Sequence, residues 1–572
     1  MALQFARVCV EGKSRKWVSG TAPQMTNNET AQHDARLMEM ARASCTLSAP
    51  EGAVLHSRRS QPRRVVRAAA RASSSKPLYA CGIDVGTQGT KCLLYDIERN
   101  VVAGRGSYQY DLLPQPSNRP NAAEQDPETW MDGIRASLAE ALADADADAD
   151  QVISVGVSGQ QHGMVALDKS GNVVRPAKLW CDTESAAQAK TISKHPSFGG
   201  WQMQASFTAS KVAWLRDVEP LNFEKTKHVL LPHDYINFRL TNTLATEAGD
   251  ASGLGILDLT TRRYDKEKCA AVDERVLTLL PKDILPCDVQ VGKVTEEGSN
   301  ATGLPVGISV STGSGDNACA AIGAGSVTPG TLVVSLGTSG TLFGASDTAI
   351  VDNSGTIAPF CDALGGYLPL LCTLNCTKVV EEARAFARKD IETSLPSHDS
   401  LSEYASQIPP GCDGVQFLPY LVGERTPNWP DASGAVCGLR PGSLSKPGVL
   451  YRAAMEGATY TLLTGAEKMR SLGLQKPNNL VCVGGGSKSR LWRQIVANVF
   501  DARVVVPVES ESAALGAAKQ AASLFLKTST KKFVSENAPE FDEEQIEPDN
   551  ESVLAYKDAY KSFISNSNKL FD

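Results

Sequence analysis

Two glycine-rich turns, about 250 residues apart, each have an aspartate beside them. The first runs from Gly82 to Lys91 and contains Asp84, and the second runs from Ser335 to Gly340, with Asp316 upstream. Each turn follows an apolar, strand-like run, and small residues leave backbone N–H groups free to bind phosphate oxygens. Two such turns facing each other would hold a polyphosphate, with one aspartate on a metal ion and the other accepting a proton. The pattern predicts nucleotide-dependent phosphoryl transfer.

The elements around the first turn are those of a mixed α/β layer. Tyr79 to Ile83 predicts a strand, and Lys91 to Tyr95 predicts its hairpin partner. The spacing of apolar residues predicts a helix over Pro127 to Leu142, and Ile153 to Ser158 predicts a buried strand. Strands that alternate with helices indicate an α/β fold.

The second half repeats this plan. Thr331 to Leu336 and Thr341 to Gly344 predict a second strand–turn–strand, and Leu480 to Val483 predicts a strand that ends in a glycine triplet. Ala513 to Leu526 predicts an Ala-rich buried helix, and the polar stretch Thr528 to Glu551 predicts a surface excursion. We therefore expect two domains of similar plan, residues 77–325 and 326–572.

The first 76 residues have a different composition. From Gly52 to Lys76 there are six arginines but no Asp or Glu, and Ser and Ala fill the gaps. An Arg- and Ser-rich, acid-poor leader is typical of an organelle transit peptide, and its Ala-rich end favours a plastid over a mitochondrion. The alternatives are a disordered basic tail on a cytoplasmic protein and an upstream extension of the gene model. In each of these interpretations, residues 1–76 lie outside the fold.

Composition limits the kinds of partner. The net charge of −7 gives no indication of a nucleic-acid surface, and no apolar run approaches the roughly 20 residues of a membrane span. The 14 cysteines include no paired Cys-x-x-Cys motifs of a structural zinc site. We expect small-molecule ligands, no nucleic acid and no membrane, and a homodimer is one assembly that the sequence allows.

Several ordered motifs resemble the FGGY carbohydrate kinases and, within them, the xylulose kinase group. Besides the two turns, they are Ser158 to Gly163, Leu179 to Asp182, Leu231 to Tyr235, Gly315 to Asn317, Gly423 to Pro427 and Gly484 to Ser487. Each is weak alone, but together and in this order they are specific, and the resemblance covers Leu78 to about Ser523. It implies two RNase-H-like domains of the actin and hexokinase type, with a cleft between them.

The resemblance implies ATP- and Mg²⁺-dependent phosphorylation of D-xylulose to D-xylulose 5-phosphate. Gln161 stands where many bacterial members have Met, and Cys181 where several have Asn, so the exact sugar stays open. One alternative is a kinase for another ketose or polyol, such as D-ribulose. A second is a non-catalytic plastid protein that keeps the fold as a sugar- or ATP-binding scaffold.

Two aspartates are the candidates for the chemistry itself. Asp316 is the predicted general base, because a carboxylate within hydrogen-bond reach can take the proton of a primary hydroxyl. Asp84 is the predicted Mg²⁺ ligand, directly or through water. The alternative for both is a structural turn aspartate.

The predicted ATP-binding residues come from three segments. They are Gly86, Thr87, Gly337, Thr338, Gly485, Gly486 and Ser489. The two turns would offer N–H groups and hydroxyls to the phosphates, and the glycine triplet would let the adenosine lie against the backbone. Lys91 would either reach the phosphates or be a solvated lysine of the hairpin.

The predicted sugar-binding residues are Gln161, His162, Asp316 and Asn317. Gln161 and His162 follow a buried strand, at the end where open α/β sheets bind ligands. Trp180 could stack on the sugar, but a large apolar residue after a strand favours a place in the core. The remaining histidines, His233 among them, are interpreted as structural.

Overall fold

The computed structural model describes residues 76–387 and 396–572. The predicted leader therefore lies outside the described residues except for Lys76. In the described part, no helix is both long and apolar enough to cross a membrane.

The first sheet has the order β13-β14-β5-β1-β2-β3, and β15 pairs with β5 beyond β14. Its strands are β1 (Tyr79–Val85), β2 (Gly89–Asp96), β3 (Val101–Gln109), β5 (Val152–Gly159), β13 (Gln290–Lys293), β14 (Ser309–Ser311) and β15 (Ser314–Gly315). The first three strands form an antiparallel meander, whereas β5 runs parallel to β1, and β14 runs parallel to β5. The predicted hairpin around the first glycine turn is confirmed.

The second sheet repeats this pairing pattern. Its order is β18-β19-β17-β16-β22-β23, with β16 antiparallel to β17 and parallel to β22. The strands are β16 (Thr331–Leu336), β17 (Gly340–Gly344), β18 (Ala358–Cys361), β19 (Tyr367–Thr373), β22 (Asn479–Val483) and β23 (Arg503–Val505). In both sheets a glycine turn joins the first two strands, so the predicted repeat of plan is confirmed.

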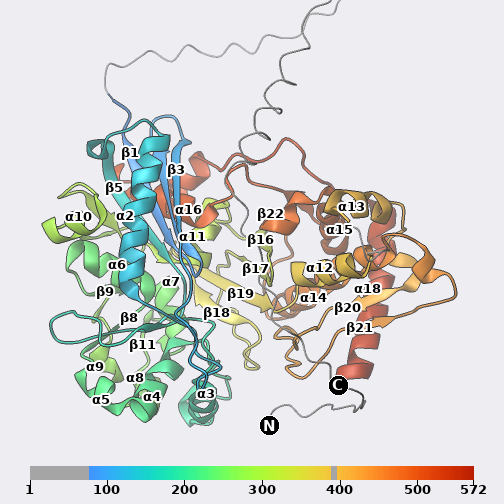
Figure 1. Ribbon diagram of the computed structural model, residues 1–572, viewed down its shortest axis with the longest axis horizontal. Helices are drawn as coiled ribbons and strands as arrows, with labels where there is room; N and C mark the ends of the chain where they lie inside the picture. The colour runs from blue at the N-terminus through green and yellow to red at the C-terminus, as the bar shows by residue number, and fades with distance from the viewer. Residues whose placement is uncertain (1–75, 388–395) are drawn as a thin grey trace, which may run out of the picture. The chain divides into compact units, whose positions relative to one another are not determined.

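Helices cover both sheets (Figure 1). Helix α2 (Pro127–Asp144) packs on β2 and β3 and buries Trp130, Ile134 and Leu138, as their spacing predicts. The second sheet is accompanied by α12 (Thr377–Phe386), α13 (His398–Ser406), α14 (Val449–Ser471), α15 (Arg490–Phe500) and α18 (Asn550–Phe571).

Helix α16 (Ser512–Phe525) packs against β1 and β5, although it follows the second sheet in the chain (Figure 1). There is no room for a side chain at Gly82, where a Cβ would lie 1.9 Å from the carbonyl oxygen of Ala514. On its other side α16 packs on α11 (Asp316–Gly323), where Gly516 lies against the backbone of Cys319. The first sheet and the segment that begins with Asp316 are thus both held by the C-terminal part of the chain.

The stretch 528–551 is more ordered than its polarity suggests. It contains α17 (Thr530–Glu536), and Ile546 forms a β-bridge with Val504 at the edge of the second sheet. Ile546 is buried there. The prediction of a surface excursion is wrong here, because the apolar side chains of Phe533, Val534 and Ile546 are buried and anchor an otherwise polar segment.

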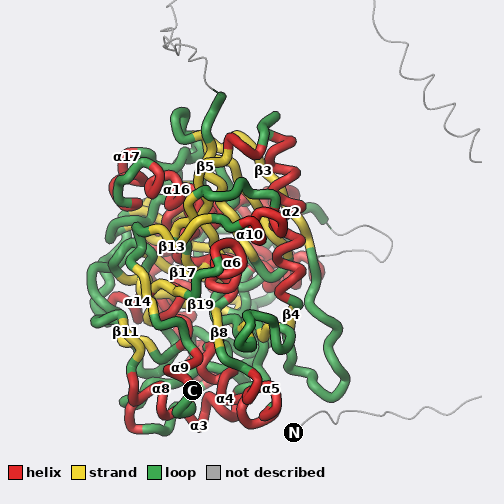
Figure 2. Tube along the Cα trace, turned by 90° about the vertical axis from the view of Figure 1, so that its left-hand side faces the viewer, coloured by secondary structure: helices red, strands yellow, loops and turns green. Residues whose placement is uncertain are grey.

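Smaller elements gather beside the first sheet. Helices α3 (Ala186–Ile192), α4 (Thr208–Val218), α5 (Pro220–Lys225), α8 (Lys266–Val272) and α9 (Val276–Leu279) lie together, as Figure 2 shows. Nearer the sheet are α6 (Pro232–Thr241), α7 (Ala248–Ala251) and α10 (Glu296–Thr302). Short strand pairs connect them: β4 (Glu124–Gln125) with β7 (Ala177–Lys178), β6 (Val165–Leu167) with β8 (His228–Leu230), β9 (Ala245–Glu247) with β12 (Asp283–Leu285), and β10 (Leu257–Asp258) with β11 (Arg263–Tyr264). In the second half, β20 (Gln416–Leu418) pairs with β21 (Ala435–Cys437).

Candidate active site

The two predicted aspartates lie on either side of strand β5. In the sheet register Asp84 of β1 is opposite Ser158 of β5, and Ser158 Oγ donates a 2.7 Å hydrogen bond to Asp84 Oδ1. On the other edge of β5, Gly315 is opposite Gly159, which places Asp316 directly after the pairing ends. Two residues far apart in the chain are therefore brought to the carboxyl ends of neighbouring strands, where ligands bind in such sheets.

The two carboxylates influence each other electrostatically. Burial, and next the charge of Asp84, raise the pKa of Asp316 to about 8. The pKa of Asp84 is also raised, mainly by burial, against the opposing effect of the Ser158 hydrogen bond. Two acidic groups whose pKa values are raised by burial and by a like charge are typical of a functional site.

Asp84 lines a pocket of about 870 Å³. One side of the pocket is the first glycine turn with β2 and β3, and the other is the segment 509–511 that leads into α16. Across it, the Lys91 ammonium is ion-paired with Glu511, and Arg105 is ion-paired with Glu509 at 2.7 Å. Lys91 is therefore not an unpaired lysine of the hairpin, and the carboxylate of Glu511 already balances the charge that would bind a phosphate.

Three of the predicted sugar-binding residues contact one another. Asn317 Nδ2 donates to Gln161 Oε1 at 3.1 Å and to Asp316 Oδ1 at 2.7 Å. The backbone N–H of Asn317 also donates to Asp316 Oδ1 at 2.7 Å. One carboxylate oxygen of Asp316 is therefore fixed by its neighbour, and within the described residues no hydrogen bond is recorded to the other, Oδ2.

His162, the fourth, lies in an apolar wall. Its ring centroid is 4.8 Å from that of Phe207 and 5.4 Å from that of Phe360, which comes from β18 of the second sheet. Burial lowers the pKa of His162 to about 3, so the ring is neutral near pH 7. Nδ1 lies 3.0 Å from the carbonyl oxygen of Gly253 and must carry the proton, because a carbonyl can only accept. Nε2 is then left as an acceptor for a hydroxyl.

The second glycine turn and the glycine triplet also come together. They follow β16 and β22, which are adjacent and parallel, with Ser335 opposite Val483. Gly486 packs on Leu336, the last residue before the turn, where a Cβ would lie 2.7 Å from that of Leu336. Gly337 and Thr338 accept backbone hydrogen bonds from the start of α12, which fixes the turn. Gly485 has open space on its Cβ side, whereas Gly486 is enclosed.

Some predicted ATP-binding groups already have partners. The N–H of Gly86 donates to the carbonyl of Gly89 within the turn, at 3.0 Å. The Thr87 hydroxyl donates to Gln160 and accepts from Trp180 Nε1 at 2.9 Å. The Ser489 hydroxyl caps the N-terminus of α15. If ATP binds to these groups, it either adds a hydrogen bond to the existing one or replaces it.

Trp180 is not a core residue. Its side chain is 39% exposed and lines the pocket beside Thr87. The prediction of a core position is wrong because a network of buried charges, and not apolar packing, fixes this segment.

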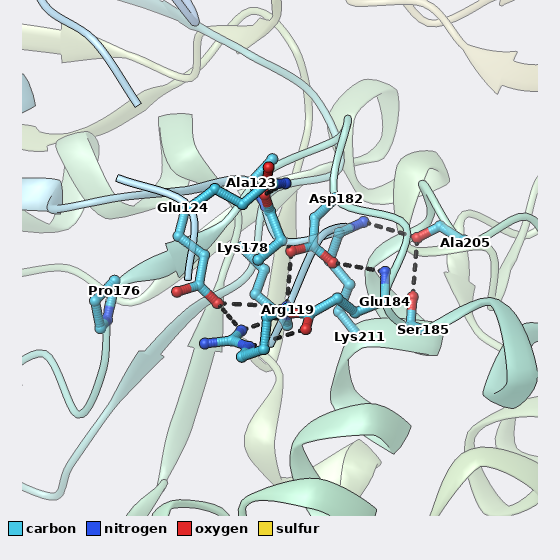
Figure 3. Close-up of polar contacts among 12 residues, drawn as sticks. Arg119, Ala123, Glu124, Pro176, Lys178, Asp182, Glu184, Ser185, Ala205 and Lys211 are labelled. Carbon is cyan, nitrogen blue, oxygen red and sulfur yellow. Dashed lines mark hydrogen bonds and ion pairs between the residues drawn. The ribbon is translucent and has the colours of Figure 1, made fainter. Parts of the chain in front are cut away.

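Figure 3 shows that network. Lys178 is fully buried and lies 2.7 Å from Asp182 and 2.5 Å from Glu184, and its ammonium is 3.9 Å from the ring centroid of Trp214. Arg119 bridges Glu124 and Glu184. Asp182 also accepts the backbone N–H of Ala123, so the two ends of the Trp180 loop are held.

The carboxylates of Glu124, Asp182 and Glu184 approach within 4.8 Å of one another, as metal ligands do. Their negative charge is already balanced by Lys178, Arg119 and Arg175. This set therefore reads as an ion-pair network. Asp84 fits a Mg²⁺ ion better, since it lines the pocket and its recorded hydrogen bond, from Ser158, engages Oδ1.

Sequence reasoning missed three contributors to the site. Ser158, which orients Asp84, belongs to one of the family-like motifs, but its residue type alone does not predict this role. Glu511 and Lys178 had no distinguishing pattern, because charged residues of this kind are usually solvated. Only pairing between distant parts of the chain makes them recognisable.

Known proteins are similar to this chain over most of its length. Residues 79–323 match the model of the FGGY family of carbohydrate kinases, N-terminal domain, and residues 332–525 match that of the C-terminal domain. The chain is 35% identical over 511 residues to a xylulose kinase from Haemophilus influenzae, covering 86% of this chain and 99% of the relative. It is 39% identical over 463 residues to a xylulose kinase from Streptomyces rubiginosus, covering 79% and 89%. The crystal structure of a "xyloylose kinase" from Brucella ovis superposes with a TM-score of 0.78 at 29% identity, covering 86% and 99%.

Proposed function

Because the chain belongs to the FGGY family of carbohydrate kinases, we propose that it phosphorylates D-xylulose to D-xylulose 5-phosphate with Mg²⁺-ATP. The chain is a carbohydrate kinase; the sugar, the metal and the residue roles are our proposal. The sugar is suggested by the relatives, which are named xylulose kinases. The observation that carries the mechanism is the approach of Asp84 and Asp316 at the ends of strands that flank β5.

Asp316 acts as the general base. In its ionised form its free carboxylate oxygen accepts the proton of the terminal hydroxyl as the phosphoryl group arrives. The hydrogen bonds from Asn317 hold the carboxylate in one orientation. The elevated pKa makes it a stronger proton acceptor than an ordinary aspartate once it is ionised.

Asp84 holds the metal, directly or through water, and Ser158 orients it. Mg²⁺, when bound, neutralises charge on the phosphate oxygens. Gly86, Thr87, Gly337 and Thr338 bind the phosphates, and Gly485, Gly486 and Ser489 bind the adenosine. Gln161, His162 and Asn317 bind the sugar hydroxyls, and Trp180 borders the entrance beside Thr87.

A panel of sugars with an ADP-release assay tests the proposal. D-xylulose should give a kcat/KM at least ~10-fold above those of D-ribulose and glycerol, since losing one buried hydrogen bond in a polar site costs at least this factor. Strong preference for another ketose or polyol would refute the sugar and keep the reaction class. ATP binding without turnover on any sugar would instead support the scaffold alternative.

The plastid location and the homodimer stay proposals of the same kind. The basic, acid-free stretch from Gly52 to Lys76 supports organelle import over a cytoplasmic location, and its Ala-rich end favours a plastid over a mitochondrion. A fluorescent protein fused after residue 76 should accumulate in plastids, and a diffuse cytoplasmic signal would contradict the proposal. Size-exclusion chromatography with light scattering would show whether the protein is a dimer.

A further inference from the structure

The motif Leu231 to Tyr235 has no role in the mechanism above, yet it places a histidine between two buried carboxylates. His233, at the start of α6, is 1% exposed, and its Nδ1 lies 2.6 Å from Asp250 Oδ2. Its Nε2 faces Asp234 Oδ1 at 3.4 Å. Burying two carboxylates and an imidazole is costly, so such a group calls for a reason.

The contact with His233 engages only one oxygen of Asp250. Asp250 itself is completely buried, and within 76–387 and 396–572 its Oδ1 has no hydrogen-bond partner. The same holds for Gln161 Nε2, in a side chain that is 4% exposed. An unpaired buried acceptor and an unpaired buried donor are each unfavourable, which indicates that something else satisfies them.

These two unpaired atoms lie against the same residue. A Cβ added to Gly315 would be 2.7 Å from Gln161 Nε2 and 2.9 Å from Asp250 Oδ1. Gly315 immediately precedes the base Asp316, and the charge of Asp250 is one of the causes that raise the pKa of Asp316. The amide donor and the carboxylate acceptor therefore both lie against the Cα of Gly315, beside the base.

A group that joins these atoms must accept one hydrogen bond and donate another. A hydroxyl does both, and the reaction proposed above brings a polyhydroxyl substrate to Asp316. We propose that Asp250 Oδ1 and Gln161 Nε2 together bind one secondary hydroxyl of the sugar, and that His233 is a positioning residue that aims the Asp250 carboxylate. This inference rests on the proposed function and adds Asp250 and His233 to the residues that select the sugar.

The test compares Asp250→Asn with Asp234→Asn, the carboxylate on the opposite side of the same imidazole. Each protein is assayed on the preferred sugar and on its deoxy analogues, which each lack one secondary hydroxyl. Asp250→Asn should lower kcat/KM for the full sugar ~10- to 100-fold, mainly through KM, with KM for ATP unchanged. On one deoxy analogue, wild type and Asp250→Asn should be equally active, because the bonding partner is gone from both.

His233→Gln should show a smaller loss of kcat/KM for the full sugar, and this loss should disappear on the same analogue. The kcat/KM of Asp234→Asn should stay within ~3-fold of that of wild type. A purely structural role, or a bound water, would make the loss in Asp250→Asn equal on every analogue, and that result overturns the proposal. A similar loss in Asp234→Asn would also overturn it. If Asp250→Asn does not fold, Gln161→Leu replaces it, since its loss should disappear on the same analogue.

Calorimetric titration of the sugars without ATP separates this inference from the proposed function. A panel with no turnover contradicts the kinase reaction on those sugars. The subsite would still be supported if Asp250→Asn bound the full sugar more weakly than wild type and the two proteins bound one deoxy analogue equally well. No measurable binding of any sugar to wild type would overturn the subsite too.

Discussion

Replacing the candidate base with its isosteric amide, Asp316→Asn, should abolish turnover and stabilise the folded protein at neutral and alkaline pH. Burial and the charge of Asp84 raise the pKa of Asp316 from 3.8 to about 8. A carboxyl with a raised pKa binds its proton more tightly in the folded chain than in the unfolded chain. The free energy of unfolding of the wild type therefore falls as pH rises from about 4 to about 8.

The size of this effect follows from the two pKa values. At ~1.36 kcal/mol per pKa unit, ionisation of the unfolded carboxyl lowers the free energy of unfolding by up to about 4 kcal/mol at pH 7. Asp316 is half-buried, and the solvent it meets weakens the effect, so we expect Asp316→Asn to gain ~2 kcal/mol. The gain should grow between about pH 5 and about pH 8.5, because the amide does not titrate.

Urea unfolding of both proteins across this pH range, with EDTA and without nucleotide, measures the gain. Turnover of Asp316→Asn should fall at least ~10²-fold, as expected for loss of a general base. Asp347→Asn is the control, because Asp347 is exposed, and it should change neither quantity. A variant no more stable than wild type at pH 8.5, or a gain independent of pH, would refute the electrostatic reasoning; near-normal turnover would remove Asp316 from the mechanism.

Three other substitutions test separate parts of the structure. Gly82→Ala should destabilise the protein by at least ~1–3 kcal/mol in thermal or urea unfolding, since its methyl group would collide with the backbone of α16. Gly485→Ala, on an open face, should unfold like wild type but raise KM for ATP. Equal stability of the two variants would contradict this packing. Lys178→Met should lower the free energy of unfolding by ~3–5 kcal/mol because it leaves the buried carboxylate of Asp182 without its ion-pair partner. Lys76→Met, from an exposed pair, should have almost no effect, and a Lys178→Met variant as stable as wild type would contradict our view of the network. Asp84→Asn should raise the Mg²⁺ concentration for half-maximal activity at least ~10-fold in a metal titration, and an unchanged Mg²⁺ dependence would exclude this residue as a ligand.

The parts of the site that were predictable from sequence are local. A glycine turn between two short strand-like runs is a hairpin signal, so β1–β2 and β16–β17 could be placed from composition and spacing. The approach of Asp316 to Asp84 depends on the pairing of β15 with β5, a contact between distant segments. The residues predict two aspartates with different roles beside turns that face each other, but they do not predict which strands pair to bring them together.

The errors have the same origin. Hydrophobicity favoured a core position for Trp180, but buried ion pairs hold this residue at the edge of the pocket. The polar stretch 528–551 predicts a surface excursion, but Ile546 pairs with Val504 of β23, a residue outside the stretch. Periodicity predicted helix α16 well, yet an Ala-rich helix carries no information about which sheet it covers.

The position of α16 has a consequence for how this polypeptide matures. A ribosome makes the strands of the first sheet early, but the helix that covers β1 and β5 is among the last segments to emerge. Until α16 is synthesised, the face of β1 and β5 that it covers stays exposed. The amino-terminal half therefore completes its folding, or is released by a chaperone, only after nearly the whole chain has been translated. A chain cut short at residue 511 would keep both aspartates and both sheets, yet it would lack the piece that closes the half made first.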